Sequence, residues 1–193
     1  MLIDDLMPRF DAARAEHVVV DAPPARAWAA IGEADFMQAY RGSPAMRALF
    51  AARGAASALA RRVTGAPAPP DPETMRPSEL PPAGEWVKLG QVDGSELDFG
   101  AIGVFWGRDI AWREIRATEF AAFSEPGYAR VVANLSVRPY GEGRSLLSYE
   151  TRTQATDEAS RRGFLRYWRI VGPGVGIVLR GTLRYIKGIA EDP

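Results

Sequence analysis

The sequence predicts an α+β fold in which a curved antiparallel sheet of about seven strands closes around a long C-terminal helix, with two short helices after the first strand. Two observations carry this prediction. Residues 85–156 read as short strands separated by turn residues. Residues 157–191 keep one apolar face at helical spacing. Residues 1–65 offer one strand and two helices, too little for a separate core, so we expect residues 1–193 to form a single domain.

Composition narrows the possible functions. The 193 residues include 24 Lys and Arg and 24 Asp and Glu, so the net charge is zero. Such a balance gives no overall attraction to nucleic acid or anionic membrane, and we expect neither a nucleic-acid partner nor a membrane span. The absence of cysteine excludes disulfides, thiolate nucleophiles and Cys-based zinc sites. The acidic N-terminus does not resemble a signal peptide, so a cytoplasmic monomer or homodimer is expected.

The first strand and two helices are predicted from local signals. Residues 13–21 contain the β-branched run Val18–Val20 and are expected to form a strand. The prolines after Asp21 then suit the first turn of a helix over residues 23–31. Ser43 followed by Pro44 repeats this start, and a second, alanine-rich helix is expected over residues 43–63.

Residues 66–82 change character, because seven of these 17 residues are proline. Neither a helix nor a central strand tolerates that density. The two interpretations are a linker between domains and a long surface loop inside one domain. We favour the surface loop, because the preceding residues are too few to form an independent core.

Six strands are predicted in the middle of the chain, at residues 85–92, 97–106, 110–115, 119–123, 128–140 and 144–156. In the fifth of these, apolar Val131 and Leu135 alternate with polar Arg130 and Asn134. Such alternation indicates an antiparallel sheet with one buried and one solvated face. Glu96 and Asp98 fall opposite the apolar set and are expected to be surface charges.

The C-terminal segment contains Gly172-Pro173-Gly174, which should interrupt a helix. However, its apolar residues stay in phase across Pro173, and Pro173 itself falls on the opposite side. We therefore predict one long helix, kinked near Gly172, with two separate helices as the alternative. The apolar line comprises Phe164, Trp168, Val171, Val175, Val178, Leu179, Thr182, Ile186 and Ile189.

The opposite face of this helix is basic. One hypothesis is a docking stripe for anionic lipid, nucleic acid or an acidic partner. The other, which we favour, is a solvated face whose arginines pair with acids elsewhere. The basic residues are Arg162, Arg166, Arg169, Arg180, Arg184 and Lys187.

The chain resembles the SRPBCC superfamily of helix-grip proteins, which includes START-like lipid-binding domains and polyketide cyclase-like proteins. The resemblance rests on the opening from Val18 to Trp28, the strand from Leu135 to Pro139, the Gly-rich hairpin after it and Tyr167-Trp168 in the last helix. It covers nearly all of the chain after about residue 13. It implies a helix-grip fold with a hydrophobic cavity between the sheet and the C-terminal helix, but no shared catalytic motif.

Few residues suggest catalysis. His17 is the single histidine, which argues against multi-histidine metal sites, and a structural role is expected for it. No G-x-S-x-G nucleophile elbow occurs. Glu114 shares a strand face with Ile110 and Trp112 and is a candidate carboxylate at the cavity edge. No metal and no cofactor is expected, and no catalytic residue is assigned.

A cavity wall is predicted from the inward strand positions and the apolar helix face. Aromatic walls with a few hydroxyls suit a flat or lipidic ligand, although the same side chains could simply fill the core. The small residues Ala101, Gly103 and Ala133 on this wall favour a cavity. The predicted ligand-binding residues are Phe99, Phe105, Trp112, Leu135, Tyr149, Thr151, Trp168 and Val175.

Three functional hypotheses follow. The first is binding of a small hydrophobic or aromatic ligand without catalysis. The second is an enzyme of the cyclase or dehydratase type, in which the cavity and one polar group such as Glu114, Tyr149 or His17 steer a reactive substrate. The third is an interaction protein that uses the basic helix face.

Overall fold

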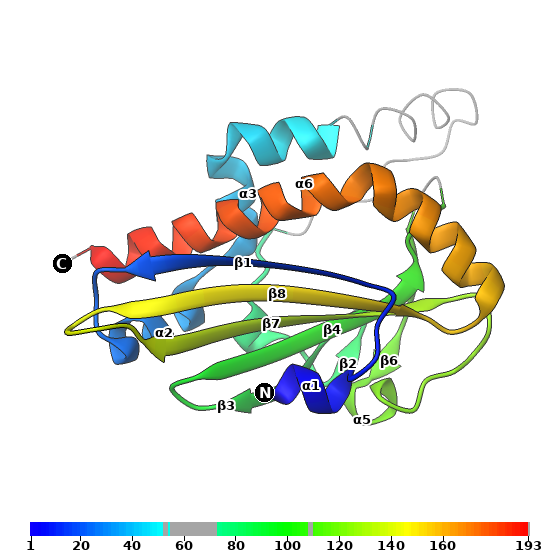
Figure 1. The fold of residues 1–193 in the computed structure, drawn as a ribbon, viewed down its shortest axis with the longest axis horizontal. Coiled ribbons are helices and arrows are strands. Elements are labelled where there is room, and N and C mark those ends of the chain that lie inside the picture. Colours follow the sequence, from blue (N-terminus) through cyan, green and yellow to red (C-terminus); the bar gives the residue numbers. More distant parts are fainter. Residues whose placement is uncertain (52–53, 55–72, 108–109, 193) are drawn as a thin grey trace.

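The structure is a computed structural model that describes residues 1–51, 54, 73–107 and 110–192. Figure 1 shows a sheet with the longest helix lying along one side of it. The helices are α1 (Leu2–Leu6), α2 (Pro24–Glu33), α3 (Phe36–Gly42), η1 (Pro77–Glu79), α5 (Ala117–Phe120) and α6 (Glu158–Glu191). The strands are β1 (Ala12–Val20), β2 (Ala83–Gly84), β3 (Trp86–Val92), β4 (Glu96–Val104), β5 (Ala111–Arg113), β6 (Ile115–Arg116), β7 (Ala129–Pro139) and β8 (Ser145–Ala155).

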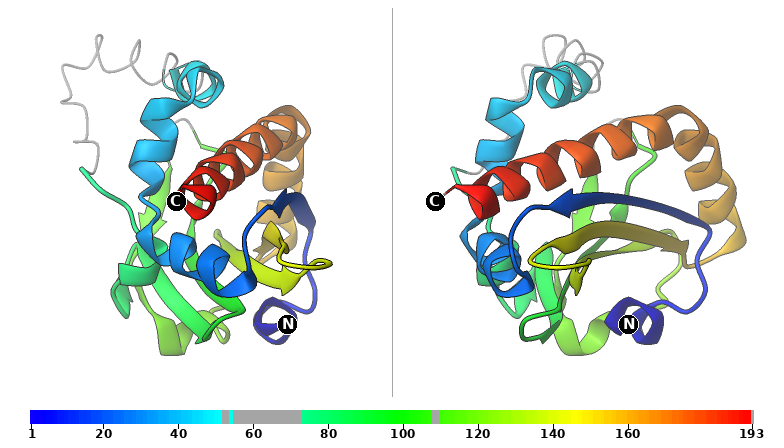
Figure 2. Two further views of the ribbon diagram at one scale, coloured as in Figure 1. Left: turned by 90° about the vertical axis from the view of Figure 1, so that its left-hand side faces the viewer. Right: turned by 60° about the vertical axis from the view of Figure 1, so that its left-hand side comes forward.

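The main sheet is antiparallel and has six strands, in the order β1-β8-β7-β4-β3 with β5 paired to β4. The two remaining strands, β2 and β6, form a separate small sheet. Both views in Figure 2 place α6 on the concave side of the curved main sheet and α1 on the opposite side. This arrangement confirms the predicted helix-grip architecture. None of the described helices is long and apolar enough to cross a membrane.

The helix α6 is continuous through Pro173, so the prediction of one long helix is confirmed and the two-helix alternative is wrong. Its N-cap is Asp157, whose carboxylate accepts hydrogen bonds from the backbone N–H groups of Ala159 and Ser160 at 2.8 and 2.9 Å. Pro173 is exposed, on the side away from the sheet. A proline on the convex side bends a helix around its core, and Figure 1 shows α6 curving over the end of the sheet.

Two glycines on different faces of α6 allow its neighbours to approach closely. A Cβ atom on Gly176 would lie 2.9 Å from the guanidinium of Arg14 on β1. A Cβ atom on Gly174 would lie 2.8 Å from the Leu49 side chain. At these positions the lower helix propensity of glycine is accompanied by close packing against β1 and against the segment at 44–51.

The concave core forms where α2 and α6 cover the sheet. Ile31 of α2 and Ile186 of α6 are buried with Leu135 and Leu147, which come from β7 and β8. All four side chains are at most 1% exposed. Burial of a large aliphatic side chain contributes about 1.5–3 kcal/mol, so this layer holds the helices onto the sheet.

The convex face of the sheet is not uniformly solvated, which corrects the prediction of one wet face. A second hydrophobic core lies there, because α1 and α5 cover the middle strands. Ile3 of α1 and Phe120 of α5 are fully buried, together with Val132 of β7. The residues of this core are Ile3, Met7, Val87, Ile102, Ile115, Phe120 and Val132.

Glu96 and Asp98 are therefore buried rather than surface charges. Asp98 is 0% exposed and Glu96 is 9% exposed. The backbone N–H of Leu2 donates to the Glu96 carboxylate at 2.8 Å. The side chain of Asn134, which pairs with Asp98 across β4 and β7, donates to the Asp98 carboxylate. The polar side of β4 thus faces α1 instead of water.

Two predicted strands differ from the structure. Residues 119–123 were expected to form a strand, but Ala117–Phe120 is the short helix α5, which turns Phe120 into the convex core. Its end is held by Arg130, which donates to the carbonyl oxygens of Phe120 and Ala121. Residues 110–115 are not one strand but contribute to two, because the chain leaves the main sheet at Glu114.

The helices after β1 are more numerous than predicted. The helix α2, at Pro24–Glu33, confirms the helix predicted over residues 23–31. The helix α3 was not predicted, although Asp35 caps it by accepting from the Met37 N–H at 2.9 Å. A further helical segment at 44–51 begins after Ser43, as predicted. Most of the remainder of the predicted helix, to residue 63, lies outside the described residues.

The described part of the Pro-rich segment, residues 73–82, has one short 3-10 helix, η1. Its backbone is tied to neighbouring elements: the Phe36 N–H donates to the Met75 carbonyl oxygen at 2.8 Å. The Ala117 N–H donates to the Pro82 carbonyl oxygen, also at 2.8 Å. This part of the segment therefore packs on the fold that carries the site.

Candidate functional site

A pocket of about 550 Å³ opens on the concave side of the sheet. Its walls come from α3, the helical segment at 44–51, the inward strand faces and one turn of α6. The lining residues are Phe36, Met37, Tyr40, Met46, Phe50, Ala51, Met75, Trp86, Phe99, Tyr149, Val178 and Thr182. We call this space the larger pocket.

Three aromatic rings form one wall of the larger pocket. Phe36 of α3 lies with its ring centroid 6.0 Å from that of Phe99 on β4 and 5.9 Å from that of Tyr149 on β8. The rings of Phe99 and Tyr149 are 6.3 Å apart. These distances are typical of favourable edge or tilted contacts, so the wall is stabilised without a ligand.

Tyr149 brings a hydroxyl group to this apolar wall. The residue is 6% exposed, and no hydrogen bond to its hydroxyl is found within the described part of the chain. Burial raises the pKa of the Tyr149 phenol above its ordinary value. The phenol is therefore neutral at physiological pH, and it offers a hydrogen-bond donor rather than a general base.

A second pocket, of about 180 Å³, lies farther along the sheet beneath the first half of α6. Phe105 and Trp112 meet there with ring centroids 5.8 Å apart. Trp168 lies above them on α6, with its ring 5.7 Å from that of Phe164. The lining residues of this smaller pocket are Trp86, Phe105, Ile110, Trp112, Val131, Thr151, Thr153, Phe164, Tyr167, Trp168, Val171 and Val175.

The predicted ligand-binding residues divide between these pockets. Phe99 and Tyr149 line the larger pocket. Phe105, Trp112, Thr151, Trp168 and Val175 line the smaller one. Leu135 is 0% exposed, belongs to the concave core and lines neither pocket.

The side of the larger pocket that α3 supplies was not predicted from the sequence. Phe36 and Tyr40 are four residues apart and lie on one helix face, directly after the Asp35 cap. This spacing of two aromatic residues was the signal in the sequence that could have identified the α3 side of the pocket. Trp86 was missed as well, because the inward position at the start of a short strand carries no distinctive pattern.

Two polar candidates lie outside both pockets. Glu114 is exposed in a shallow depression beside Arg116, so the prediction that it sits at the cavity edge is wrong. The reason is the switch of sheets at this residue. His17 is exposed on β1, where its Nδ1 lies 2.8 Å from the hydroxyl oxygen of Ser148. Of the three predicted polar candidates, only Tyr149 lines the larger or the smaller pocket.

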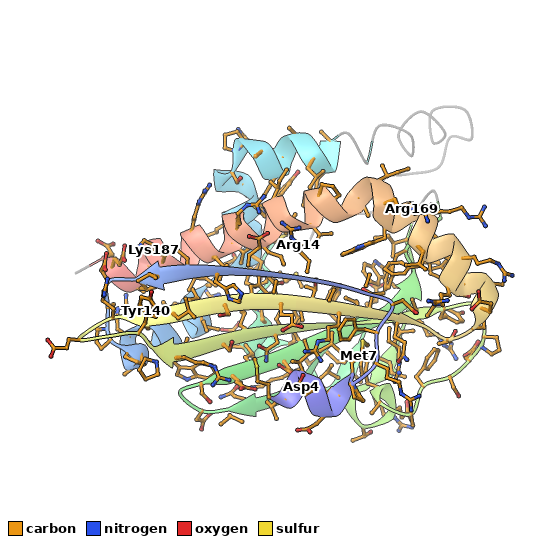
Figure 3. All side chains as sticks on the ribbon, viewed as in Figure 1. Asp4, Met7, Arg14, Tyr140, Arg169 and Lys187 are labelled. Atoms are coloured by element: carbon orange, nitrogen blue, oxygen red, sulfur yellow. The ribbon has the colours of Figure 1, made fainter. Side chains whose placement is uncertain are left out.

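The basic face of α6 is partly neutralised. Arg180 donates to Glu16 on β1 at 2.7 Å, and the same carboxylate accepts from Arg14. Lys187 donates to the Val19 carbonyl oxygen at 2.8 Å. Figure 3 shows Arg14 beneath α6 and Arg169 extending away from the molecule. The exposed members of the face are Arg162, Arg166, Arg169 and Arg184.

The residues that line the two pockets carry no charge. Neither lining includes an Asp, Glu, His, Lys or Arg side chain among the described residues. No group of three or more His, Asp or Glu side chains in the described ranges could hold a metal ion. The chemistry on offer is therefore apolar contact, aromatic stacking and a few hydroxyl groups.

Comparisons with known proteins identify no family for this chain. No protein-family model matches the sequence, and no curated protein matches it. A solution NMR structure of a protein from Arthrobacter aurescens has 12% identity and a TM-score of 0.40, over 94% of this chain and 87% of that chain. The crystal structure of the Zhui aromatase/cyclase from Streptomyces sp. R1128 has 13% identity and a TM-score of 0.30, over 93% of each chain. At these TM-scores the likeness carries no conclusion about function.

Proposed function

We propose that this chain binds a small hydrophobic or aromatic molecule in the larger pocket. The observation that carries the proposal is an apolar space of about 550 Å³ between the sheet and α6. Ligand pockets of proteins are usually about 300–1,000 Å³ and mostly apolar, with a few placed polar groups. The larger pocket has this size and this character.

The lining also defines the class of ligand. A charged ligand would lose its hydration in this pocket, and no described lining residue offers an opposite charge. The part of the ligand that enters the larger pocket is therefore uncharged. The neutral Tyr149 hydroxyl supports binding of a carbonyl or hydroxyl oxygen on the ligand, because a buried oxygen without a donor costs about 1–3 kcal/mol.

The test is a binding titration with N-phenyl-naphthylamine, a neutral dye that fluoresces in apolar surroundings. We expect saturable binding by the wild type. Val178→Phe adds a ring to the wall of the larger pocket and is expected to weaken dye binding at least about tenfold.

Ile170→Phe is the matched control, since it adds a similar ring to an 82% exposed position of the same helix. It should bind the dye like the wild type. The proposal fails if the wild type shows no saturable binding, or if Val178→Phe binds as tightly as the control.

The second candidate function is a cyclase or dehydratase acting in the same pocket. The observation in its favour is the neutral phenol of Tyr149, which could donate a proton to a leaving hydroxyl group. The described lining offers no base to remove a proton from carbon, so binding is the better supported function. The test is the dehydration of an aromatic β-hydroxy ketone to the conjugated enone, measured by absorbance. Dehydration by the wild type that is lost in Tyr149→Phe would favour the enzyme.

A further inference from the structure

Trp86 lies between the larger and the smaller pocket and lines both of them. No other described residue is shared by the two linings. The half-buried Trp86 is the first residue of β3, and its ring centroid is 5.9 Å from that of Phe99 in the larger pocket. On the other side it is 5.6 Å from the ring of Trp112 in the smaller pocket.

These contacts belong to one row of rings that passes along both pockets. Successive centroids from Phe36 through Phe99, Trp86 and Trp112 to Phe105 are 6.0, 5.9, 5.6 and 5.8 Å apart. An apolar ligand that followed this row could keep aromatic contact along its whole length. Trp86 stands at the middle of the row, where the two spaces are separated.

Small residues on β4 make room for this row. Ala101 pairs directly with Trp86, and Gly103 pairs directly with Trp112. A Cβ atom on Gly103 would lie 2.9 Å from the Ala111 carbonyl oxygen, 3.1 Å from the ring of Phe105 and 3.3 Å from that of Trp112. The space that these small residues leave on β4 is thus occupied by Trp86 of β3, Trp112 of β5 and Phe105, which follows β4. We therefore expect a smaller residue at position 86 to join the two pockets.

We propose that Trp86 is a specificity-determining residue that sets the length of the ligand. This inference rests on the proposed function. The ligand is an uncharged, elongated apolar molecule whose polar end reaches the Tyr149 hydroxyl and whose tail points along the row of rings. In the wild type the tail ends at Trp86. Without the indole ring, the tail continues toward Trp112 and Trp168.

The experiment measures how tightly linear primary alcohols displace N-phenyl-naphthylamine as their chains lengthen from about six to about sixteen carbons. Each methylene that enters an apolar pocket improves affinity by about fourfold. The wild type should show this gain up to a limiting length and no gain beyond it. Trp86→Ala should continue to gain affinity for several further carbons.

Trp86→Leu is a second variant that keeps an apolar side chain in the concave core. It should increase the limiting chain length of the alcohols by less than Trp86→Ala does. Both variants are first checked by circular dichroism and thermal unfolding. The double variant Trp86→Ala/Val175→Phe fills the smaller pocket and should restore the shorter limit. Trp86→Ala/Ile170→Phe is its matched control and should keep the longer limit.

The outcomes separate this inference from the proposed function. A folded Trp86→Ala or Trp86→Leu protein with the wild-type limit overturns the role of Trp86, while dye binding by the wild type still supports the pocket. A longer limit that Val175→Phe leaves unchanged also overturns it, because the added length would not come from the smaller pocket. A wild type that binds neither dye nor alcohols refutes the proposed function itself.

Discussion

At the scale of single residues, Asp98 and Asn134 form an unusual buried pair on the convex side of the sheet. They are 0% and 1% exposed, and they are direct partners across β4 and β7. Asn134 donates to one Asp98 oxygen, while Asp98 Oδ2 and Asn134 Oδ1 have no partner among the described residues. Both orphan atoms are acceptors, and a proton on Asp98 would supply the missing donor.

The electrostatic surroundings of Asp98 favour that proton. The pKa of Asp98 is raised to about 7, and burial is the largest cause. The hydrogen bond from Asn134 acts to lower this pKa, and the negative charge of Glu96 acts to raise it. The positive charges of the N-terminus and Arg152 act to lower it. The balance leaves a carboxyl group that binds its proton more tightly in the folded than in the unfolded chain.

This difference predicts a pH dependence of stability. Because the folded pKa lies above the unfolded one, the Asp98 contribution is complete below about pH 4 and is lost as the pH rises through about 7. We expect Asp98 to lower the unfolding free energy by about 2–4 kcal/mol between pH 4 and pH 8. Urea unfolding of the wild type and of Asp98→Asn at several pH values measures this decrease in the unfolding free energy.

Asp98→Asn stays neutral and keeps a donor for Asn134, so this decline should disappear in the variant. Asp93→Asn, at an exposed acid in the turn before β4, should retain the wild-type profile. Equal pH profiles for Asp98→Asn and the wild type would contradict the prediction.

At the scale of elements, glycine has two opposite roles, which can be told apart by what a Cβ atom would meet. On β4, a Cβ atom at Gly100 would lie 2.6 Å from the Val131 carbonyl oxygen and 2.8 Å from Leu89. On α6, a Cβ atom at Gly188 would meet nothing within 4 Å. The first glycine is required by packing against backbone, and the second costs helix propensity without a packing reason.

The helix therefore offers a stabilising substitution. Gly188→Ala should raise the unfolding free energy by about 1 kcal/mol, because alanine loses less backbone entropy on forming the helix. Thermal and urea unfolding of the variant measure this gain. A variant less stable than the wild type would show that position 188 is constrained in a way that the open space around it does not reveal.

The strand offers the opposite case with the same substitution. Gly100→Ala should lower the unfolding free energy by about 1–3 kcal/mol, because the new methyl group overlaps a backbone oxygen that cannot rotate away. The same urea titration measures the loss, with Gly188→Ala as the control for a glycine-to-alanine change. Wild-type stability in Gly100→Ala would contradict the packing seen on β4.

At the scale of the whole molecule, the sheet carries a core on each face. The concave core belongs to α2 and α6, and the convex core belongs to α1 and α5. The helix α1 is also tied to distant strands by polar contacts. Arg152 of β8 forms an ion pair with Asp4 at 2.8 Å and donates to the Met7 carbonyl oxygen at 3.1 Å. The short N-terminal helix is therefore an integral part of the fold.

We expect Ile3→Ala to destabilise the whole fold, because Ile3 is fully buried against the sheet. Removal of such a side chain typically costs about 2–5 kcal/mol. Asp5→Ala, at an exposed position of the same helix, is the control and should change little. Urea unfolding followed at the Trp residues, which lie outside α1, shows whether the loss is global. An unchanged midpoint for Ile3→Ala would mean that α1 detaches without affecting the sheet.

Much of the architecture could be predicted from local patterns. The phase of the apolar residues across Pro173 predicted α6, and the alternation in the strand that forms β7 predicted the antiparallel sheet. The candidate site was predicted in part: Phe99 and Tyr149 line the larger pocket, but Leu135 only fills the core. Phe36 and Trp86 were missed, since their inward direction depends on how α3 and β3 meet the rest of the chain.

By itself, the sequence determined which side of each long element is apolar, because the repeats of helices and strands place neighbouring side chains at known angles. Only the tertiary structure decided what covers each side. It buried Asp98 under α1, brought Phe36 next to Tyr149 and placed Trp86 between two pockets. The physical reason is that periodicity is local, whereas burial depends on segments far apart in the chain, such as residues 1–7 and the strand β4.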